Sequence, residues 1–146
     1  MPQPRQRVVF QPEVRQGLQQ GIHAVVSAVR PTLGPRSRVV VSELHTGATA
    51  FEFLDDAGTI ARRIIQLPDR DQDVGAMLAR KTIWQVHDQA GDGAATAAVI
   101  FESVFDQGMK YITAGGNAMA LRRHLETGRD IILDELARMT VQVRGP

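Results

Sequence analysis

The apolar residues of this chain recur every three or four positions in four separate segments, and this spacing limits its folding more than any other feature. Such positions fall on one side of a helix, so each segment presents a single apolar stripe. We therefore predict a mainly α fold whose helices bury these stripes. The stripes comprise Leu18, Ile22, Val25, Val26 and Val29; Val74, Met77, Leu78 and Val86; Ala97, Phe101, Val104, Gly108 and Ile112; and Leu121, Leu125, Gly128, Ile132, Leu136 and Met139.

Proline and glycine mark where these helices end. Pro31 and the pair at residues 34–35 end the first helix, because proline removes a backbone donor and restricts the residue before it. Residues 91–93, with two glycines, separate the helix predicted at 71–90 from the next one. Glycines 115 and 116 end that third helix, and Asn117 is expected to cap the fourth.

Two β-prone runs, residues 38–41 and 50–54, flank a polar stretch at 42–49 and predict a hairpin with a long loop. A third run, residues 7–10, predicts a short strand near the amino terminus. An isolated hairpin is marginal in water and its edges invite pairing. Pairing with a second copy of the chain would satisfy both elements, and pairing within one molecule is the alternative.

Size and charge narrow the classes of function. A chain of 146 residues is expected to form one domain. Its formal net charge of +1 is too small to attract nucleic acid or an anionic membrane, so we expect neither of these as a partner. The absence of cysteine excludes disulfide scaffolds and thiol chemistry and favours a reducing compartment, for which the cytoplasm is the default expectation. No segment has the roughly 20 apolar residues that span a bilayer, and residues 1–11 lack the apolar part of a signal peptide.

The break at residues 91–93 is the candidate for chemistry. Its glycines let a ligand approach the backbone, and the amides that begin the next helix attract anions. Asp92 could hold a hard cation such as Mg²⁺, and Thr96 adds a hydroxyl in the first helical turn. The alternative is a plain connection between two helices with Asp92 as the N-cap, and the spacing alone does not exclude it.

Four separated blocks resemble the group I, GroEL-like chaperonins in order and spacing. They are VVSAVRPTLGP at residues 25–35, DAGTIAR at 56–62, AGDGAATA at 90–97 and AGGNAMALRR at 114–123. The resemblance extends from about Val8 to about Val141. It implies the amino-terminal half of an equatorial domain, which binds ATP and contacts other subunits, at residues 1–146.

The same resemblance implies what the chain lacks. The apical domain, the intermediate domain with the principal catalytic carboxylate, and the carboxy-terminal half of the equatorial domain would follow Pro146. We expect a fragment of a longer protein, with a naturally short relative as the alternative. Hydrolysis by this chain alone is not expected. Implied partners are other chaperonin subunits in a homo-oligomer, a possible co-chaperonin, and non-native polypeptides bound through the absent parts.

The resemblance assigns roles to individual residues, with ATP and Mg as the implied cofactors. Asp56 matches an aspartate near the γ-phosphate and the attacking water, and Asp92 matches the Mg-holding aspartate. The nucleotide-contacting segment and the phosphate-cradling helix start are matched by Thr32, Leu33, Gly34 and Pro35 and by Gly93, Ala94, Ala95 and Thr96.

Three residues depart from the family pattern around the nucleotide. Ala94 and Ala95 stand where the family has threonines, and each lost hydrogen bond to a charged phosphate costs on the order of 1.5–3 kcal/mol. Asp55 replaces a Lys or Asn and adds negative charge opposite a polyanion. These departures support the alternative of a degenerate, non-enzymatic interaction or oligomerisation module. A third alternative, an autonomous anion-binding helical domain, needs only the helix start at Gly93.

The four histidines lack the spacing of metal ligands, and we expect surface or interface roles for them. They are His23, His45, His87 and His124. Trp84, near His87 on the second helix, is interpreted as a packing residue rather than one that stacks on a nucleotide.

Overall fold

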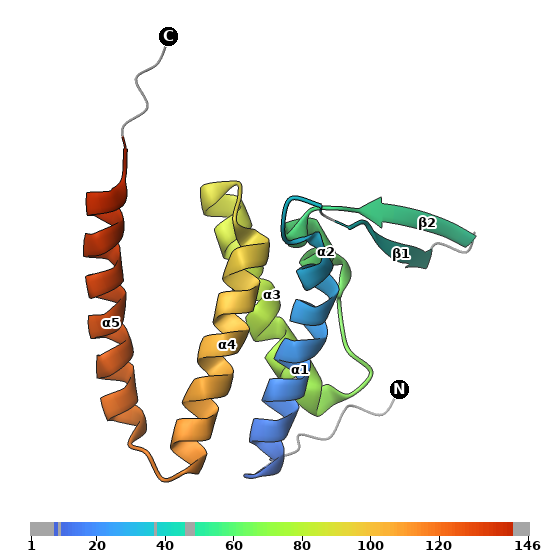
Figure 1. The fold of residues 1–146 in the computed structure, drawn as a ribbon. Helices are drawn as coiled ribbons and strands as arrows, with labels where there is room; N and C mark the ends of the chain where they lie inside the picture. Colours follow the sequence, from blue (N-terminus) through green and yellow to red (C-terminus); the bar gives the residue numbers. More distant parts are fainter. Residues whose placement is uncertain (1–7, 9, 37, 46–48, 142–146) are drawn as a thin grey trace. The chain divides into compact units, whose positions relative to one another are not determined.

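The computed structural model describes residues 8, 10–36, 38–45 and 49–141, and this part of the chain is mainly α with one two-stranded sheet (Figure 1). The predicted fold class is confirmed. The elements are α1 (Glu13–Val29), a 3₁₀ turn η1 (Arg30–Thr32), β1 (Val40–His45), β2 (Thr49–Leu54), α2 (Ala57–Arg63), α3 (Arg70–Ala90), α4 (Ala94–Thr113) and α5 (Ala118–Met139).

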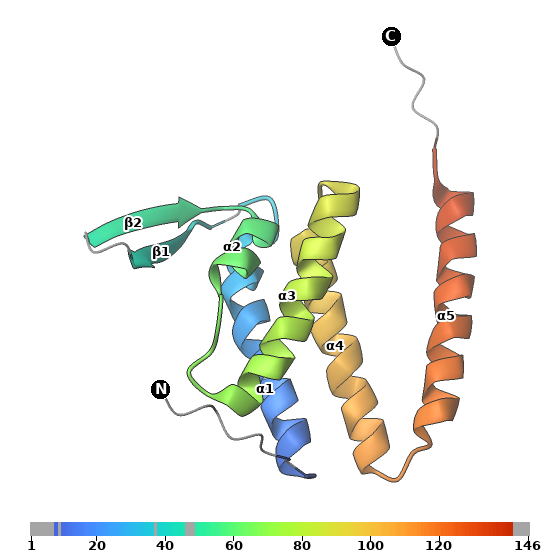
Figure 2. The ribbon, with the colours of Figure 1, turned by 180° about the vertical axis from the view of Figure 1, so that it is seen from behind.

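The chain divides into two compact units, Met1–Asp106 and Gln107–Pro146, and each is described by itself. The first unit contains the hydrophobic core, in which α1 contributes four of the largest buried side chains. These are Ile22, Val25, Val26 and Val29, all predicted core positions. Figure 2, the view from behind, shows α3 passing along α1 with α2 at one end of the pair.

Glycines allow α1 and α3 to approach each other closely. A Cβ atom on Gly21 of α1 would overlap the carbonyl oxygen of Gln72, and one on Gly75 of α3 would overlap that of Leu18. A Cβ on Gly17 would lie 2.8 Å from the carbonyl oxygen of Asp71. The two backbones therefore pack directly against each other where these three glycines lie.

This close packing overturns the predicted buried face of α3. Met77 is 57% exposed and Leu78 44% exposed, and Val74 is also exposed. The residues that face the core are instead the small Gly75, Ala76 and Ala79 together with Ile83. The prediction was wrong for Val74, Met77 and Leu78, because large side chains would hold the helices apart, whereas glycine and alanine let α1 approach. Val86, the fourth predicted residue, is partly buried and packs against the core.

The third and fourth predicted stripes also differ from the structure. On α4 the buried residues are Ala94, Ala98 and Glu102, and Val104 is 44% exposed. Phe101 of the predicted face is partly buried and packs against the core. No residue of α5 is buried. Its cap is as predicted, because the Asn117 side chain accepts hydrogen bonds from the backbone N–H groups of Met119 and Ala120.

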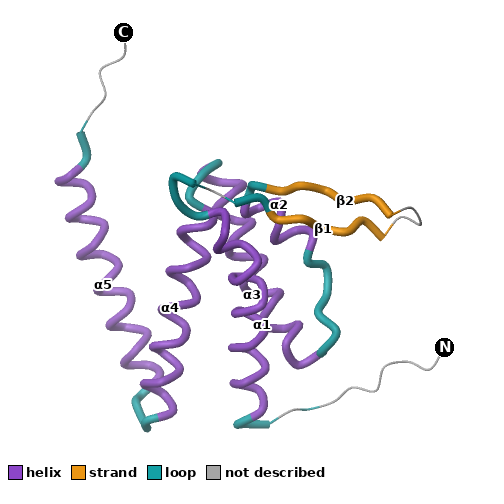
Figure 3. Tube along the Cα trace, turned by 45° about the vertical axis from the view of Figure 1, so that its right-hand side comes forward, coloured by secondary structure: helices purple, strands orange, loops and turns teal. Residues whose placement is uncertain are grey.

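The predicted hairpin is confirmed, with a shorter loop than expected (Figure 3). The two strands pair from Val40 opposite Leu54 to His45 opposite Thr49. Both strands therefore extend into residues 42–49, which were predicted as loop. Residues 46–48 lie outside the described part. The inner face places Leu54 in the core, whereas Phe53 on the outer face is 73% exposed.

The strand predicted at residues 7–10 falls mainly outside the described residues, and Val8 and Phe10 belong to no strand. Helix α2 was not predicted as a helix. Its seven residues are too few for a readable stripe, but its N-cap Asp56 accepts a hydrogen bond from the Thr59 N–H, and Ile60 is buried against α1 and α3.

Candidate functional site

A cavity of about 120 Å³ lies where the end of α3, the start of α4, the start of α2 and the end of η1 meet. Three sequence blocks that lie far apart in the chain contribute to it. Seven of the residues expected around a nucleotide line the cavity: Thr32, Asp55, Asp56, Asp92, Gly93, Ala94 and Ala95. The cavity is also lined by Ala57, His87 and Gly91. The fold therefore brings most of the predicted site into one place.

The turn between α3 and α4 presents its backbone openly. Gly91 has φ +73° and ends α3 by donating its N–H to the carbonyl oxygen of His87, and Gly93 has φ +77°. A side chain at either position would be strained, although nothing lies within 4 Å of an added Cβ. Glycine is therefore needed for the shape of the turn, and the space beside it is free for a ligand.

The first turn of α4 supplies backbone donors to this side of the cavity. The N–H of Ala97 makes a helical hydrogen bond to the Gly93 carbonyl oxygen. The amides of residues 94–96 precede that bond and have no partner within the helix. They also carry the positive end of the helix dipole, so this wall favours an anion such as a phosphoryl group.

Asp56 stands opposite the turn at the start of α2. Partial burial acts to raise its pKa, but hydrogen bonds from Thr59 and the neighbouring His87 outweigh that effect, and the pKa lies below its ordinary value. The Thr59 N–H lies 2.6 Å from Oδ2, and Nδ1 of His87 lies 3.3 Å from Oδ1. The carboxylate is thus held in its charged form at the edge of the cavity.

His87 is the cavity residue that the sequence reasoning missed. Its side chain is 29% exposed and packs on Gly58, where an added Cβ would clash with the imidazole. Its sequence position held a signal, because His87 lies four residues before the helix-ending Gly91 and so on the last turn of α3. A side chain on that turn of the helix lies close to the loop that follows, and His87 lines the same cavity as that loop.

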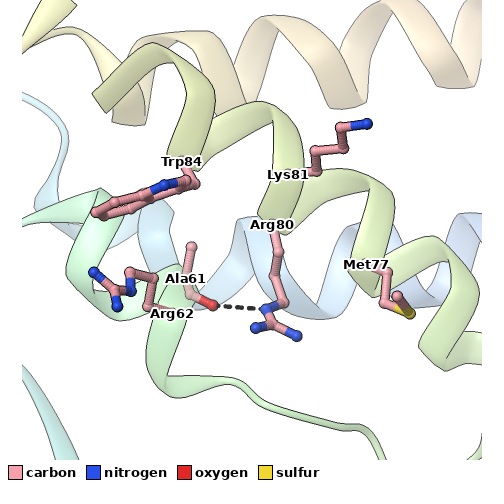
Figure 4. Close-up of a pocket in the computed structure, with 6 residues that line it drawn as sticks. All are labelled: Ala61, Arg62, Met77, Arg80, Lys81 and Trp84. Atoms are coloured by element: carbon pink, nitrogen blue, oxygen red, sulfur yellow. Dashed lines mark hydrogen bonds between the residues drawn. The ribbon is translucent and has the colours of Figure 1, made fainter. Parts of the chain in front are cut away.

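A larger groove of about 390 Å³ is lined by Arg62, Arg80 and Trp84, among others (Figure 4). The Arg62 guanidinium carbon lies 4.4 Å from the centroid of the Trp84 ring, and that ring lies 5.0 Å from the His87 ring. Arg80 donates to the carbonyl oxygens of Ala61 and Ile65 and so ties α3 to the end of α2. Of these residues, Trp84 is the one that contacts His87.

Four predicted site residues do not line the cavity: Leu33, Gly34, Pro35 and Thr96. Leu33 lines a separate cavity of about 550 Å³ with Arg30, Arg36 and Arg38. Thr32 does reach the candidate site, but its hydroxyl donates to the Val29 carbonyl oxygen at 2.8 Å. Its oxygen therefore remains as an acceptor rather than as a donor to phosphate.

The residues present fit a magnesium ion only together with a phosphate ligand. Asp92 offers one carboxylate, whose Oδ1 accepts the Gly93 N–H at 2.6 Å. Within the described ranges no three His, Asp or Glu side chains gather closely enough to bind a metal. Mg²⁺ in nucleotide sites commonly takes one or two carboxylates and completes its shell with phosphate oxygens and water. A lone Asp92 beside an anion-binding helix start meets that requirement.

The known structures decide the fold. No family model matches the sequence. The chaperonin gp146 from the bacteriophage EL 2 (Pseudomonas aeruginosa), crystallised in the presence of ATP-BeFx, matches 90% of this chain with a TM-score of 0.71 and 18% identity. The chain has a chaperonin fold. It spans 22% of the phage chaperonin chain. In the part of the chain that the structure describes, no helix combines the length and apolar character needed to cross a membrane.

Proposed function

We propose that this chain is the amino-terminal, ATP-binding segment of a chaperonin equatorial domain. In that role it holds the phosphates of a nucleotide with their Mg²⁺ and contacts neighbouring subunits of an ATP-dependent protein-folding machine. The observation that carries the proposal is the meeting of Thr32, Asp56 and the turn at residues 91–95 around one cavity of a chaperonin fold. The phage chaperonin crystallised with ATP-BeFx shares that fold.

Each wall of the cavity has a distinct part in this role. The amides at the start of α4 bind phosphoryl oxygens, and Asp92 holds the metal beside them. When bound, Mg²⁺ neutralises phosphate charge. Asp56, kept charged by its contacts with Thr59 and His87, is placed to orient a water molecule toward a phosphoryl group.

Three residues weaken this site relative to the family pattern. Ala94 is buried and Ala95 is half-buried at the cavity wall, so no hydroxyl replaces the missing threonine donors there. Asp55 is exposed and adds a carboxylate to the two already present. We therefore expect this site to bind a nucleotide more weakly than a site with the family's residues at these three positions. The backbone amides at the start of α4 and the metal would provide most of the affinity.

A calorimetric titration with Mg-ATP tests the nucleotide site. The full 146-residue chain is compared with Asp92→Ala and with a double variant, Ala94→Thr with Ala95→Thr. We expect Asp92→Ala to abolish the binding heat, because the metal loses its carboxylate. The double variant should bind about tenfold more tightly, because one restored hydrogen bond to a charged group is worth about 1.5 kcal/mol. Equal, negligible heats in all three proteins would refute the proposal for this chain.

A degenerate interaction module is the second candidate, and the exposed face of the hairpin supports its contact with another chain. Val41, Phe51 and Phe53 lie on its outer face and are 56%, 57% and 73% exposed. Such a row is costly in water unless another chain covers it. The same face serves subunit contacts in the first proposal, so the two candidates differ only in nucleotide binding.

Sedimentation tests the subunit contact. Phe53→Ser should lower the mass of the assembly, because it removes the most exposed aromatic ring of the hairpin. Ile65→Ser is the matched control, since Ile65 is 77% exposed but lies outside the strands. An assembly mass that Phe53→Ser leaves unchanged would count against a contact through this face.

A further inference from the structure

The candidate site has a shortage of positive charge and of side-chain donors. Three carboxylates line it, those of Asp55, Asp56 and Asp92, and two alanines replace donors at the α4 wall. Among the described residues that line the cavity, His87 is the one side chain able to carry a positive charge. Among these side chains, His87 is therefore the candidate for a positively charged hydrogen-bond donor to a phosphate in the cavity.

His87 is held in place on several sides. The Asp56 carboxylate lies 3.3 Å from Nδ1, and Gly58 leaves room for the imidazole where any Cβ would clash. Trp84 stacks on the ring at a centroid distance of 5.0 Å and is itself covered by Arg62. The side chain is therefore oriented before a ligand arrives, which lowers the entropy cost of using it.

The two ring nitrogens have different surroundings. Nδ1 faces the Asp56 carboxylate, whose Oδ1 lies 3.3 Å away. Nε2 has no hydrogen-bond partner among the described residues, although the ring lines the cavity. The ring therefore lies between the Asp56 carboxylate and the cavity that an anion would enter.

We propose that His87 is a phosphate-binding residue of this cavity and donates from Nε2 to a phosphoryl oxygen. This hydrogen bond partly replaces those that threonine hydroxyls would donate to phosphate at positions 94 and 95, where this chain has alanine. The ligand class is a Mg-bound polyphosphate. The inference rests on the proposed nucleotide site, and it assigns to this chain a side-chain contact on the α3 wall, opposite the start of α4.

The test compares His87→Ala and His87→Gln with the unaltered full chain. His124→Ala is the matched control, an exposed histidine on α5 in the second unit. Mg-ATP and Mg-tripolyphosphate, which lacks base and ribose, are titrated calorimetrically into each protein. We expect His87→Ala to bind both ligands about tenfold more weakly, as for one hydrogen bond to a charged group. His87→Gln should recover part of the affinity, and His124→Ala should bind like the unaltered chain.

A second readout separates phosphate contact from support of the fold. In ¹⁵N-labelled, unaltered protein, Mg-tripolyphosphate should shift the His87 Nε2 resonance toward the value of a protonated nitrogen and leave His124 in place. A purely structural His87 would not respond in this way. If the unaltered chain binds neither ligand, the proposed function itself is refuted. Binding that His87→Ala leaves unchanged, or an unmoved Nε2 resonance in the liganded protein, overturns the inference while the proposed function stands.

Discussion

At the scale of single residues, Glu102 is a charged side chain that the first unit buries. Its side chain on α4 is 7% exposed and contacts two groups on the α1 side, the Arg30 guanidinium and Nδ1 of His23, the latter at 2.8 Å. Both partners are more than half exposed. A buried carboxylate is costly without its cation, whereas an exposed cation without its carboxylate is hydrated by water.

This asymmetry predicts unequal effects of the two halves of the pair. Arg30→Ala should lower the free energy of unfolding by about 2 kcal/mol, because it leaves Glu102 buried with less compensation. Glu102→Leu should cost less than about 1 kcal/mol, since the side chain it introduces is apolar and its former partners reach water. Urea denaturation at neutral pH measures both, with Arg36→Ala as an exposed control. A larger loss from Glu102→Leu than from Arg30→Ala would contradict this account.

Asp56 gives a prediction for the pH dependence of stability. Its pKa is lowered in the folded chain despite partial burial, so folding favours the charged carboxylate. Its contribution is complete above the unfolded pKa of about 3.8 and is lost as the pH falls through the lower folded value. Asp56→Asn, which still caps α2, should lower stability at pH 7 by less than about 1 kcal/mol, because the carboxylate is 40% exposed to screening water.

The measurement is a series of urea denaturation curves between pH 7 and pH 2 for both proteins. The difference between them should shrink as the solution is acidified below about pH 4, the ordinary range of an aspartate. A difference that stays constant over that range would show that the charge of Asp56 adds nothing to folding.

At the scale of elements, the crossing of α1 and α3 depends on glycine rather than on large apolar side chains. Gly21→Ala should destabilise the chain by about 3 kcal/mol, because the added methyl group meets the Gln72 carbonyl oxygen and backbone must move. Gly128→Ala on α5 is the control, since nothing lies within 4 Å of its Cβ. It should be neutral or stabilise the helix by up to about 1 kcal/mol. Thermal unfolding of both variants tests the contrast.

The same crossing explains what sequence could and could not predict. Helix ends follow from local chemistry, and the breaks at Gly91 and Asn117 lie where they were predicted. The buried face of a helix depends on the helix that packs against it, which the sequence alone does not reveal. The spacing of large apolar residues therefore predicted that Met77 and Leu78 are buried, whereas the residues that meet α1 are small. The cavity residues of the turn at 91–93 were predicted from its glycines, whereas Thr32, Asp55 and Asp56 were predicted from the family resemblance. His87 was missed because its position depends on packing against Gly58, which lies 29 positions away in the chain.

At the scale of the whole molecule, the two units differ in what stabilises them. The first has a core that includes residues of α1, α2, α3 and α4, whereas α5 in the second contains no buried residue. Amides of α5 should therefore exchange with deuterium much faster than those at the centres of α1 and α3. Exchange followed by mass spectrometry measures this in the isolated chain. Equal protection of α5 and α1 would show that another surface covers α5 in solution.

The glycine crossing also determines how far apart two walls of the candidate site lie. Thr32, just after the carboxy-terminal end of α1, lines one wall of the cavity, and the turn after Ala90, at the carboxy-terminal end of α3, lines another. The close packing at the glycines lies toward the amino-terminal ends of both helices. Gly75 and Gly91 are about 24 Å apart along the axis of α3. A difference of about 5° in the crossing angle would therefore displace the end of α3 at Gly91 by about 2 Å. The crossing angle that these glycines allow therefore determines the width of the cavity more than about 20 Å away.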